Sequence, residues 1–195
     1  MSDPLLHVLA GPNGAGKSTL YDAVIAPVAD LEFVNADVIA ATRWPEDPGG
    51  KSYNAAVLAA ERRAELIDAR ASLVTETVFS HESKLEFVQT AIDLGYLVTL
   101  HVVMVPEALA VARVANRVGA GGHTVPEDKI RQRYRRLWPL VASAIGVVDH
   151  AIVYDNSRAG RPFQIVATFE HGSALGAPDW PVWTPHALRD AGASS

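Results

Sequence analysis

The 195-residue chain contains no cysteine. This absence excludes disulfide bonds, zinc sites built from cysteine and thiol nucleophiles, and it suits a reducing compartment. Long apolar runs are also missing, since none approaches the roughly 18 residues that a membrane span requires. The first residues, Met1 to Pro4, have neither the charged start nor the apolar stretch of a signal peptide. We therefore expect a cytoplasmic protein that does not insert into a membrane.

Positive charge is not in excess either, because 17 Lys and Arg residues are outnumbered by 22 Asp and Glu residues. A net charge of −5 does not attract a polyanion, so we expect no nucleic-acid partner. Hydrophobic residues make up 49% and charged residues 20% of the chain, as in ordinary globular proteins. A chain of this length can bury a core of its own, and we expect residues 1–195 to form one domain.

One motif lies near the start of the chain, where apolar residues 7–10 run into Gly-Pro-Asn-Gly-Ala-Gly-Lys-Ser-Thr. This segment fits the phosphate-loop pattern G-x-x-x-x-G-K-[ST] without a mismatch. The glycines allow backbone N–H groups to point at phosphate oxygens, Lys17 reaches the β- and γ-phosphates, and the Ser18 hydroxyl binds Mg²⁺. A chance match in a glycine-rich turn is the alternative, but the expected strand before it and helix after it favour nucleotide binding. The residues expected to bind ATP are Gly11, Pro12, Asn13, Gly14, Ala15, Gly16, Lys17, Ser18 and Thr19.

Strands and helices are expected to alternate along the chain. Apolar and β-branched runs predict strands at 31–34, 73–75, 97–104, 151–154 and 163–169. Helical patterns lie at 18–26, 53–70, 82–94, 106–118 and from 126 onward. This order predicts an α/β fold of the P-loop kinase type, with a parallel sheet that helices cover on both faces.

Two details of this pattern bear on the structure. On the helix expected at 53–70, Arg63 shares one face with Ala59 and Leu66. The tail, from about 174 to 195, is expected to be irregular, and its tryptophans are expected to cover the core.

Two carboxylates follow predicted strands, and the carboxyl ends of such strands form the ligand crevice of an open α/β sheet. Asp37 is a candidate to accept the proton of an attacking substrate hydroxyl, although it is also a candidate N-cap for a following helix. Glu76 is a candidate to hold Mg²⁺ through water or to orient the acceptor. Thr77, the next residue, is also a candidate to contact the acceptor.

Arginine is concentrated in one segment, since residues 113–136 contain seven Lys or Arg against two acidic residues. Arg113 and Arg117 are four residues apart and share a helix face, and a glycine-rich turn follows them. Arg131 and Arg133 flank a predicted core face formed by Ile130, Tyr134 and Leu137. We interpret residues 113–136 as a helical lid whose guanidinium groups bind phosphoryl charge. A solvated helix face is the alternative.

The loop alone fits transporter ATPases and GTPases too. This chain has neither the LSGGQ-type signature nor the apolar strand ending in Asp-Glu of the ATPases, and it lacks the Asn-Lys-x-Asp motif that reads guanine. Both classes are therefore disfavoured.

The motifs in combination resemble the zeta-toxin family of kinases, in particular its compact members. The resemblance rests on the phosphate loop, residues 33–37, 75–77, 113–118 and 121–126, and Tyr154-Asp155-Asn156-Ser157. It covers most of residues 5–157. Family members use ATP to phosphorylate the 3′-hydroxyl of UDP-N-acetylglucosamine or a related amino-sugar nucleotide, and an antitoxin silences them by blocking the nucleotide site.

By this resemblance, Asp37 is the general base, Glu76 contacts the acceptor, and Arg117 is a lid arginine. Asp155 and Asn156 would lie near the adenine, although an ordinary Asx turn explains them as well. Larger family members carry a longer lid, and this chain has His123 where their second essential arginine is expected. That residue suits hydrogen bonding within a loop, which leaves Arg131 or Arg133 as the substitute.

We therefore expect a phosphotransferase that transfers the γ-phosphoryl group of ATP, with Mg²⁺, to a hydroxyl of a sugar nucleotide. It would act as the toxin of a toxin–antitoxin pair, with a protein antitoxin as partner. A metabolic or drug-modifying small-molecule kinase, and an ATP-dependent binding module with little turnover, are the alternatives.

Overall fold

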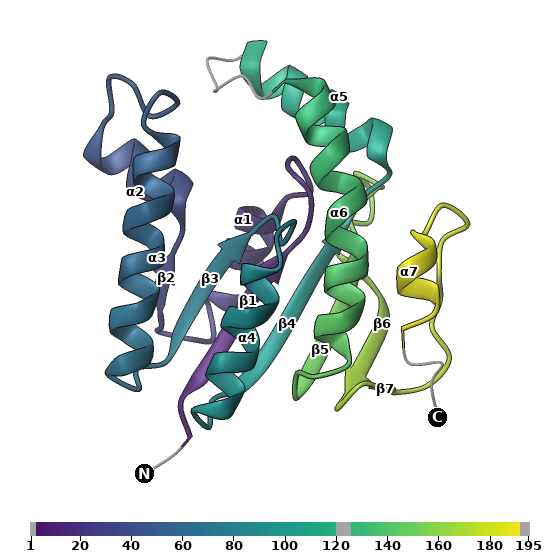
Figure 1. Ribbon diagram of the computed structural model, residues 1–195. Coiled ribbons are helices and arrows are strands. Elements are labelled where there is room, and N and C mark those ends of the chain that lie inside the picture. The colour runs from purple at the N-terminus through teal and green to yellow at the C-terminus, as the bar shows by residue number, and fades with distance from the viewer. Residues whose placement is uncertain (1–2, 120–125, 192–195) are drawn as a thin grey trace.

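The computed structural model describes residues 3–119 and 126–191. Its centre is a seven-stranded sheet in the order β2-β3-β1-β4-β5-β6-β7 (Figure 1). The strands span Leu5–Ala10 (β1), Glu32–Val34 (β2), Leu73–Thr77 (β3), Leu97–Met104 (β4), His150–Asp155 (β5), Gln164–Glu170 (β6) and Ser173–Ala174 (β7). The first five strands in this order pair in parallel, as expected, whereas β6 and β7 pair antiparallel. The expectation of a parallel sheet is thus confirmed for β1 to β5, whereas the edge formed by β6 and β7 is antiparallel.

All of the described helices except the last, which follows β7, lie in connections between the parallel strands. They span Lys17–Leu20 (α1), Ala36–Arg43 (α2), Ser52–Asp68 (α3), Ser83–Asp93 (α4), Glu107–Gly119 (α5), Glu127–Ile145 (α6) and His186–Arg189 (α7), and α1 continues into a π-helical segment, Tyr21–Ile25. The crossover through α1 leads from β1 outward to β2, while the crossover through α4 leads from β3 inward past β1 to β4. Right-handed crossovers in opposite directions place their helices on opposite faces of the sheet. Helices on both faces were expected.

The core lies between the sheet and its helices. Leu100, Val102 and Val103 in β4 are fully buried, which explains why this strand reads as a nearly continuous apolar run. The face of α6 marked by Ile130, Tyr134 and Leu137 is buried, as its spacing predicts.

The tail is more regular than expected, because it contains β7 and α7. Trp180 and Trp183 pack against the core, and this part of the expectation is confirmed. Within the described residues, no helix combines the length and the apolar character needed to cross a membrane.

Candidate active site

The phosphate loop connects β1 to α1 at the carboxyl end of the sheet. Gly14 and Gly16 adopt φ angles of 75° and 94°, which side chains with a Cβ rarely adopt. A Cβ added to Gly16 would lie 2.6 Å from Nδ2 of Asn156. Glycine at position 16 is therefore required both by the backbone conformation and by the packing of the loop.

Asn156 and Arg113 donate hydrogen bonds to backbone carbonyl groups of this loop. Asn156 Nδ2 donates a hydrogen bond to the carbonyl oxygen of Ala15 over 2.8 Å. The Arg113 guanidinium donates to the carbonyl oxygens of Gly14, over 3.4 Å, and Asn156, over 3.0 Å. Both side chains thus fix the shape of the loop, whatever else they contact.

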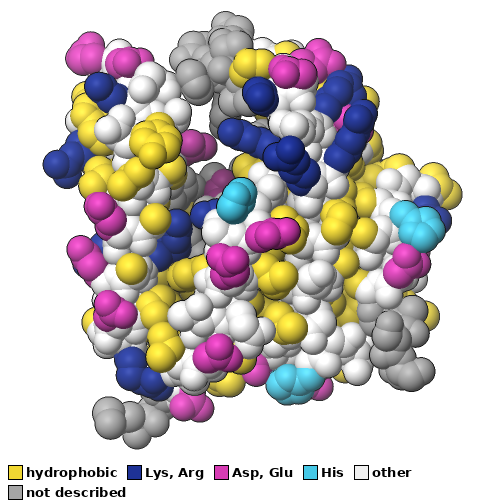
Figure 2. All heavy atoms as spheres, viewed as in Figure 1, with side chains coloured by type: hydrophobic (Ala, Val, Ile, Leu, Met, Phe, Trp, Pro, Cys, Tyr) yellow, Lys and Arg dark blue, Asp and Glu magenta, His cyan; other side chains and the backbone are white. Residues whose placement is uncertain are grey.

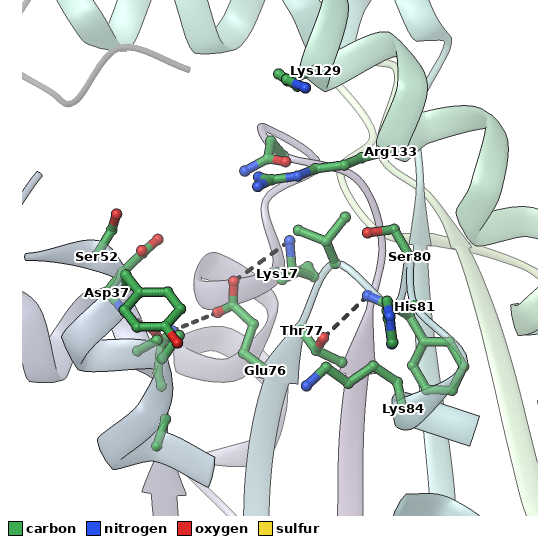
Figure 3. Close-up of a pocket in the computed structure, with 18 of the residues that line it drawn as sticks. Lys17, Asp37, Ser52, Glu76, Thr77, Ser80, His81, Lys84, Lys129 and Arg133 are labelled. Carbon is green, nitrogen blue, oxygen red and sulfur yellow. Dashed lines mark hydrogen bonds and ion pairs between the residues drawn. The ribbon is translucent and has the colours of Figure 1, made fainter. Parts of the chain in front are cut away.

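Glu76 is the centre of a polar network beside the loop (Figure 3). Its Oε2 accepts hydrogen bonds from Ser18 Oγ, over 2.7 Å, and Asn35 Nδ2, over 2.8 Å. Its Oε1 lies 3.5 Å from Lys17 Nζ, which also donates to the carbonyl oxygen of Pro12 over 3.1 Å. The end of β3 therefore places a carboxylate beside the two loop residues that the motif assigns to phosphate and metal.

These residues fit Mg²⁺ and a nucleotide phosphate. Magnesium prefers hard oxygen ligands, and the Ser18 hydroxyl and the Glu76 carboxylate supply them side by side. In the same loop, Asn13 Oδ1 is buried and has no hydrogen-bond partner among the described residues. Such an acceptor suits a hydroxyl or water brought by a ligand and not a phosphate oxygen, which is itself an acceptor.

A cleft of about 720 Å³ opens beside the loop. Asp37 is exposed to it, and its carboxylate makes no ion pair or hydrogen bond with the described residues. Figure 3 shows Asp37, Glu76 and Thr77 around the cleft, with Arg133 above Lys17 and Lys84 on the other side. The lining comes from the phosphate loop, α2, α3, the end of β3 and the segment after it, α4 and α6.

The structure brings several of the predicted site residues together around the cleft. Six of them line this cleft, namely Asn13, Lys17, Asp37, Glu76, Thr77 and Arg133. Arg131 is not among its lining residues, and it forms ion pairs with Glu127 and Glu107 instead. Arg117 lies in α5, but its side chain lies outside the described residues, as does the whole of His123.

Two alternatives from the sequence can be decided from local hydrogen bonds. Asn35, not Asp37, is the N-cap of α2, because Asn35 Oδ1 accepts hydrogen bonds from the backbone N–H groups of Asp37 and Val38. The Asx turn at Asp155 is present, because Asp155 Oδ1 accepts from the Ser157 N–H over 2.7 Å. Contact of Asp155 or Asn156 with a nucleotide base stays a prediction.

Several cleft residues were missed from the sequence, including Asn35, Tyr53, Arg63 and Lys84. A signal existed for Arg63, because it is a charged residue on a helix face that otherwise carries apolar side chains. Lys84 belongs to no motif, and only the fold brings it to the cleft.

The strand order, the glycine loop that leads into α1 and the cleft beside it define a P-loop kinase-like α/β fold. A family model described as an AAA domain matches residues 6–140, and the chain belongs to this family. A protein of Haemophilus influenzae that has not been characterised is 30% identical over 129 residues, which make up 64% of this chain and 88% of that protein.

Solved structures have the same fold. The AvrRxo1-ORF1:-ORF2 complex with ATP matches at 18% identity and a TM-score of 0.69, over 91% of this chain and 61% of that chain. The PezAT toxin–antitoxin system of Streptococcus pneumoniae matches at 13% identity and a TM-score of 0.61, over 85% of this chain and 72% of that chain. A gluconokinase of Sinorhizobium meliloti matches at 16% identity and a TM-score of 0.50, over 81% of this chain and 86% of that chain. At these identities the likeness establishes the fold alone.

Proposed function

We propose that this protein is a phosphotransferase that uses Mg·ATP to phosphorylate a hydroxyl group of a small molecule. One observation carries the proposal: Lys17 of the phosphate loop and the carboxylate of Asp37, which has no partner among the described residues, line the same cleft. A nucleotide hydrolase needs room only for a water molecule beside the γ-phosphate. A cleft of about 720 Å³ is much larger than that and has the size of a small-molecule site, which favours a kinase.

Each side chain has a role in this proposal. Lys17 neutralises the β- and γ-phosphates, and the Ser18 and Glu76 oxygens hold the metal that the nucleotide brings. The hydrogen bond between Ser18 and Glu76 favours this role for Glu76 over that of a base. Asp37, exposed to the cleft, accepts the proton of the attacking hydroxyl.

For the acceptor we propose a sugar nucleotide of the UDP-N-acetylglucosamine type, and for the biological role a zeta-type toxin with a protein antitoxin. The motif combination from the phosphate loop to Asn156 supports this assignment. The likeness of fold to PezAT, described as a toxin–antitoxin system, and to the two-protein AvrRxo1 complex agrees with it.

A small-molecule kinase outside any toxin–antitoxin pair is the second candidate. It is favoured by the match to gluconokinase, which extends over 86% of that chain and so requires no additional domain.

The test is to incubate the protein with Mg·ATP and a panel of nucleotide sugars, free sugars and sugar acids. Mass spectrometry should find one product that is heavier by one phosphoryl group. A phosphorylated nucleotide sugar supports the full proposal, and a phosphorylated free sugar or sugar acid supports the second candidate. ATP binding without any phosphorylated product would indicate a binding module and contradict both.

The toxin role has its own test, which is expression in bacteria. Active protein should slow growth, an inactive Asp37→Asn variant should not, and a small protein encoded beside the gene should restore growth. If strong expression of the active protein leaves growth unchanged, the toxin assignment is wrong.

A further inference from the structure

The cleft holds more positive charge than the phosphate loop accounts for. Among the described residues, five cations and two carboxylates line it, in a chain whose net charge is −5. Figure 2 shows Lys and Arg side chains gathered on both walls of this hollow. The cations are Lys17, Arg63, Lys84, Lys129 and Arg133. Because Glu76 already pairs with Lys17, most of this surplus is uncompensated within the part of the chain that the structure describes.

Arg63 of α3 and Lys84 of α4 form a pair of like charges within the cleft. Both side chains are half-buried, and neither makes an ion pair or a hydrogen bond with the described residues. Burial lowers the pKa of Arg63, and burial together with the Arg63 charge lowers the pKa of Lys84. The Arg63 guanidinium lies 5.7 Å from the centre of the Phe87 ring, which holds it in place.

This pair is distinct from the cations that surround the loop. Figure 3 shows Lys84 reaching into the cleft below Thr77, whereas Lys129 and Arg133 lie on the opposite side, above Lys17. Along α3, Arg63 follows Tyr53 by about 15 Å, at 1.5 Å per residue. The cleft therefore continues along α3 for about the length of a small organic molecule, and Arg63 lies at the opposite end of this stretch from Tyr53.

We infer that the phosphoryl acceptor carries an anionic group of its own, a phosphate or a carboxylate, and that Arg63 and Lys84 bind it. The inference rests on the proposed function, since it assigns the acceptor of that same cleft. Holding two desolvated cations together without a counter-charge destabilises the folded protein. A bound anion removes this cost and gains charge-assisted hydrogen bonds. Neutral sugars would leave the pair uncompensated, and we expect them to be poor acceptors.

The test measures binding of two anions by calorimetry, with a non-hydrolysable Mg·ATP analogue in excess. Inorganic pyrophosphate and malonate are the probes, and the probe that binds with the higher affinity indicates whether the acceptor carries phosphate or carboxylate. Arg63→Gln and Lys84→Gln should each weaken the tighter probe by about tenfold or more. The matched control is Arg62→Gln, because Arg62 precedes Arg63 on the same helix but pairs with Glu32 and Glu65 outside the cleft lining. Equal affinity in all variants, or no binding of either probe, overturns the inference.

Lys84→Glu separates this role from a structural one. It replaces a repulsive contact with an attractive one, so the melting temperature should rise while probe binding is lost. A fall in melting temperature with unchanged probe affinity would identify Lys84 as a structural residue and contradict the inference.

These outcomes are independent of phosphoryl transfer. Wild-type protein that binds the probe through Arg63 and Lys84 but phosphorylates nothing contradicts the proposed function alone. Active protein whose acceptor KM is the same in Arg63→Gln as in the wild type contradicts this inference alone.

Discussion

At the scale of single residues, the two carboxylates of the cleft differ in how they are held. Glu76 is constrained by Ser18, Asn35 and Lys17, whereas Asp37 contacts no partner among the described residues. A carboxylate with fixed donors suits a metal and phosphate site, and a free one suits proton transfer. The distinction could not be predicted from the sequence, because both residues simply follow a strand.

The first prediction concerns Lys17, whose side chain is only 6% exposed. Lys17→Met keeps the length of the side chain and removes the charge that neutralises the β- and γ-phosphates. Phosphoryl transfer should fall by about 10²-fold or more. The fold should survive, because Glu76 retains its hydrogen bonds to Ser18 and Asn35. Turnover and a thermal melt are measured beside Lys51→Met, an exposed control. Full activity in the folded Lys17 variant would rule out the phosphate-loop assignment.

The second prediction concerns Asp37. Asp37→Asn removes the base but leaves the cap of α2 intact, since Asn35 provides the cap. Turnover should fall by about 10²–10⁴-fold while ATP affinity and stability change little. Asp22→Asn, at an exposed position on the segment after α1, is the control. Restoration of turnover by higher Mg²⁺ would reassign Asp37 to the metal, and unchanged turnover would remove it from the mechanism.

At the scale of elements, most of the fold could be predicted because hydrophobic periodicity is strong in β4 and α6. The π-helical turn Tyr21–Ile25 left no pattern in the sequence, and neither did the reversal of β6, since a short apolar run predicts a strand but not its direction. The site was predictable where a motif fixes it, as in residues 11–19. It was not predictable where tertiary packing alone brings a residue in, as with Lys84.

Arg113 illustrates the same limit. Its spacing to Arg117 predicts a shared helix face, and the sequence favoured binding of phosphoryl charge. In the structure its guanidinium donates hydrogen bonds to the backbone carbonyl of Gly14, in the phosphate loop, and to that of Asn156. Sequence patterns identify a basic face on a helix but do not indicate which backbone oxygen lies opposite.

The third prediction tests this anchoring of the loop. Asn156→Ala removes the hydrogen bond to the Ala15 carbonyl and leaves that buried oxygen unpaired, which costs about 1–3 kcal/mol. The loop should lose its fixed shape, so the ATP dissociation constant should rise more than turnover falls. Nucleotide titration and thermal melts are compared with Asn54→Ala, an exposed position on α3. If the variant loses turnover at unchanged ATP affinity, Asn156 does not act through the loop.

At the scale of the whole molecule, a row of polar side chains crosses the centre of the sheet. His7 Nδ1 lies 3.1 Å from His101 Nε2, and His101 Nδ1 lies 3.2 Å from the Tyr154 hydroxyl, so the row joins β1, β4 and β5. Burial lowers the pKa of His7, and burial together with His7 lowers the pKa of His101 to about 3. Burial raises the pKa of Tyr154 to about 12. All three groups are therefore uncharged in the folded protein at neutral pH.

The fourth prediction follows from the sign of these shifts. In the unfolded chain a histidine binds a proton near pH 6.5, whereas folded His101 does so only near pH 3. Between these values the unfolded state binds more protons, so the free energy of unfolding falls as the pH falls, by up to about 1.4 kcal/mol per pH unit for this residue. His101→Gln keeps a donor and an acceptor but does not titrate.

The stability advantage of the wild type over His101→Gln should therefore shrink between pH 6.5 and pH 4.5. Denaturant unfolding of both proteins at each pH measures it, and the contributions of carboxylates common to both proteins cancel in the difference. A difference that stays constant over this range would show that His101 is already protonated, or freely solvated, in the folded sheet. A shrinking difference would mean that acid weakens the sheet whose carboxyl end carries the phosphate loop.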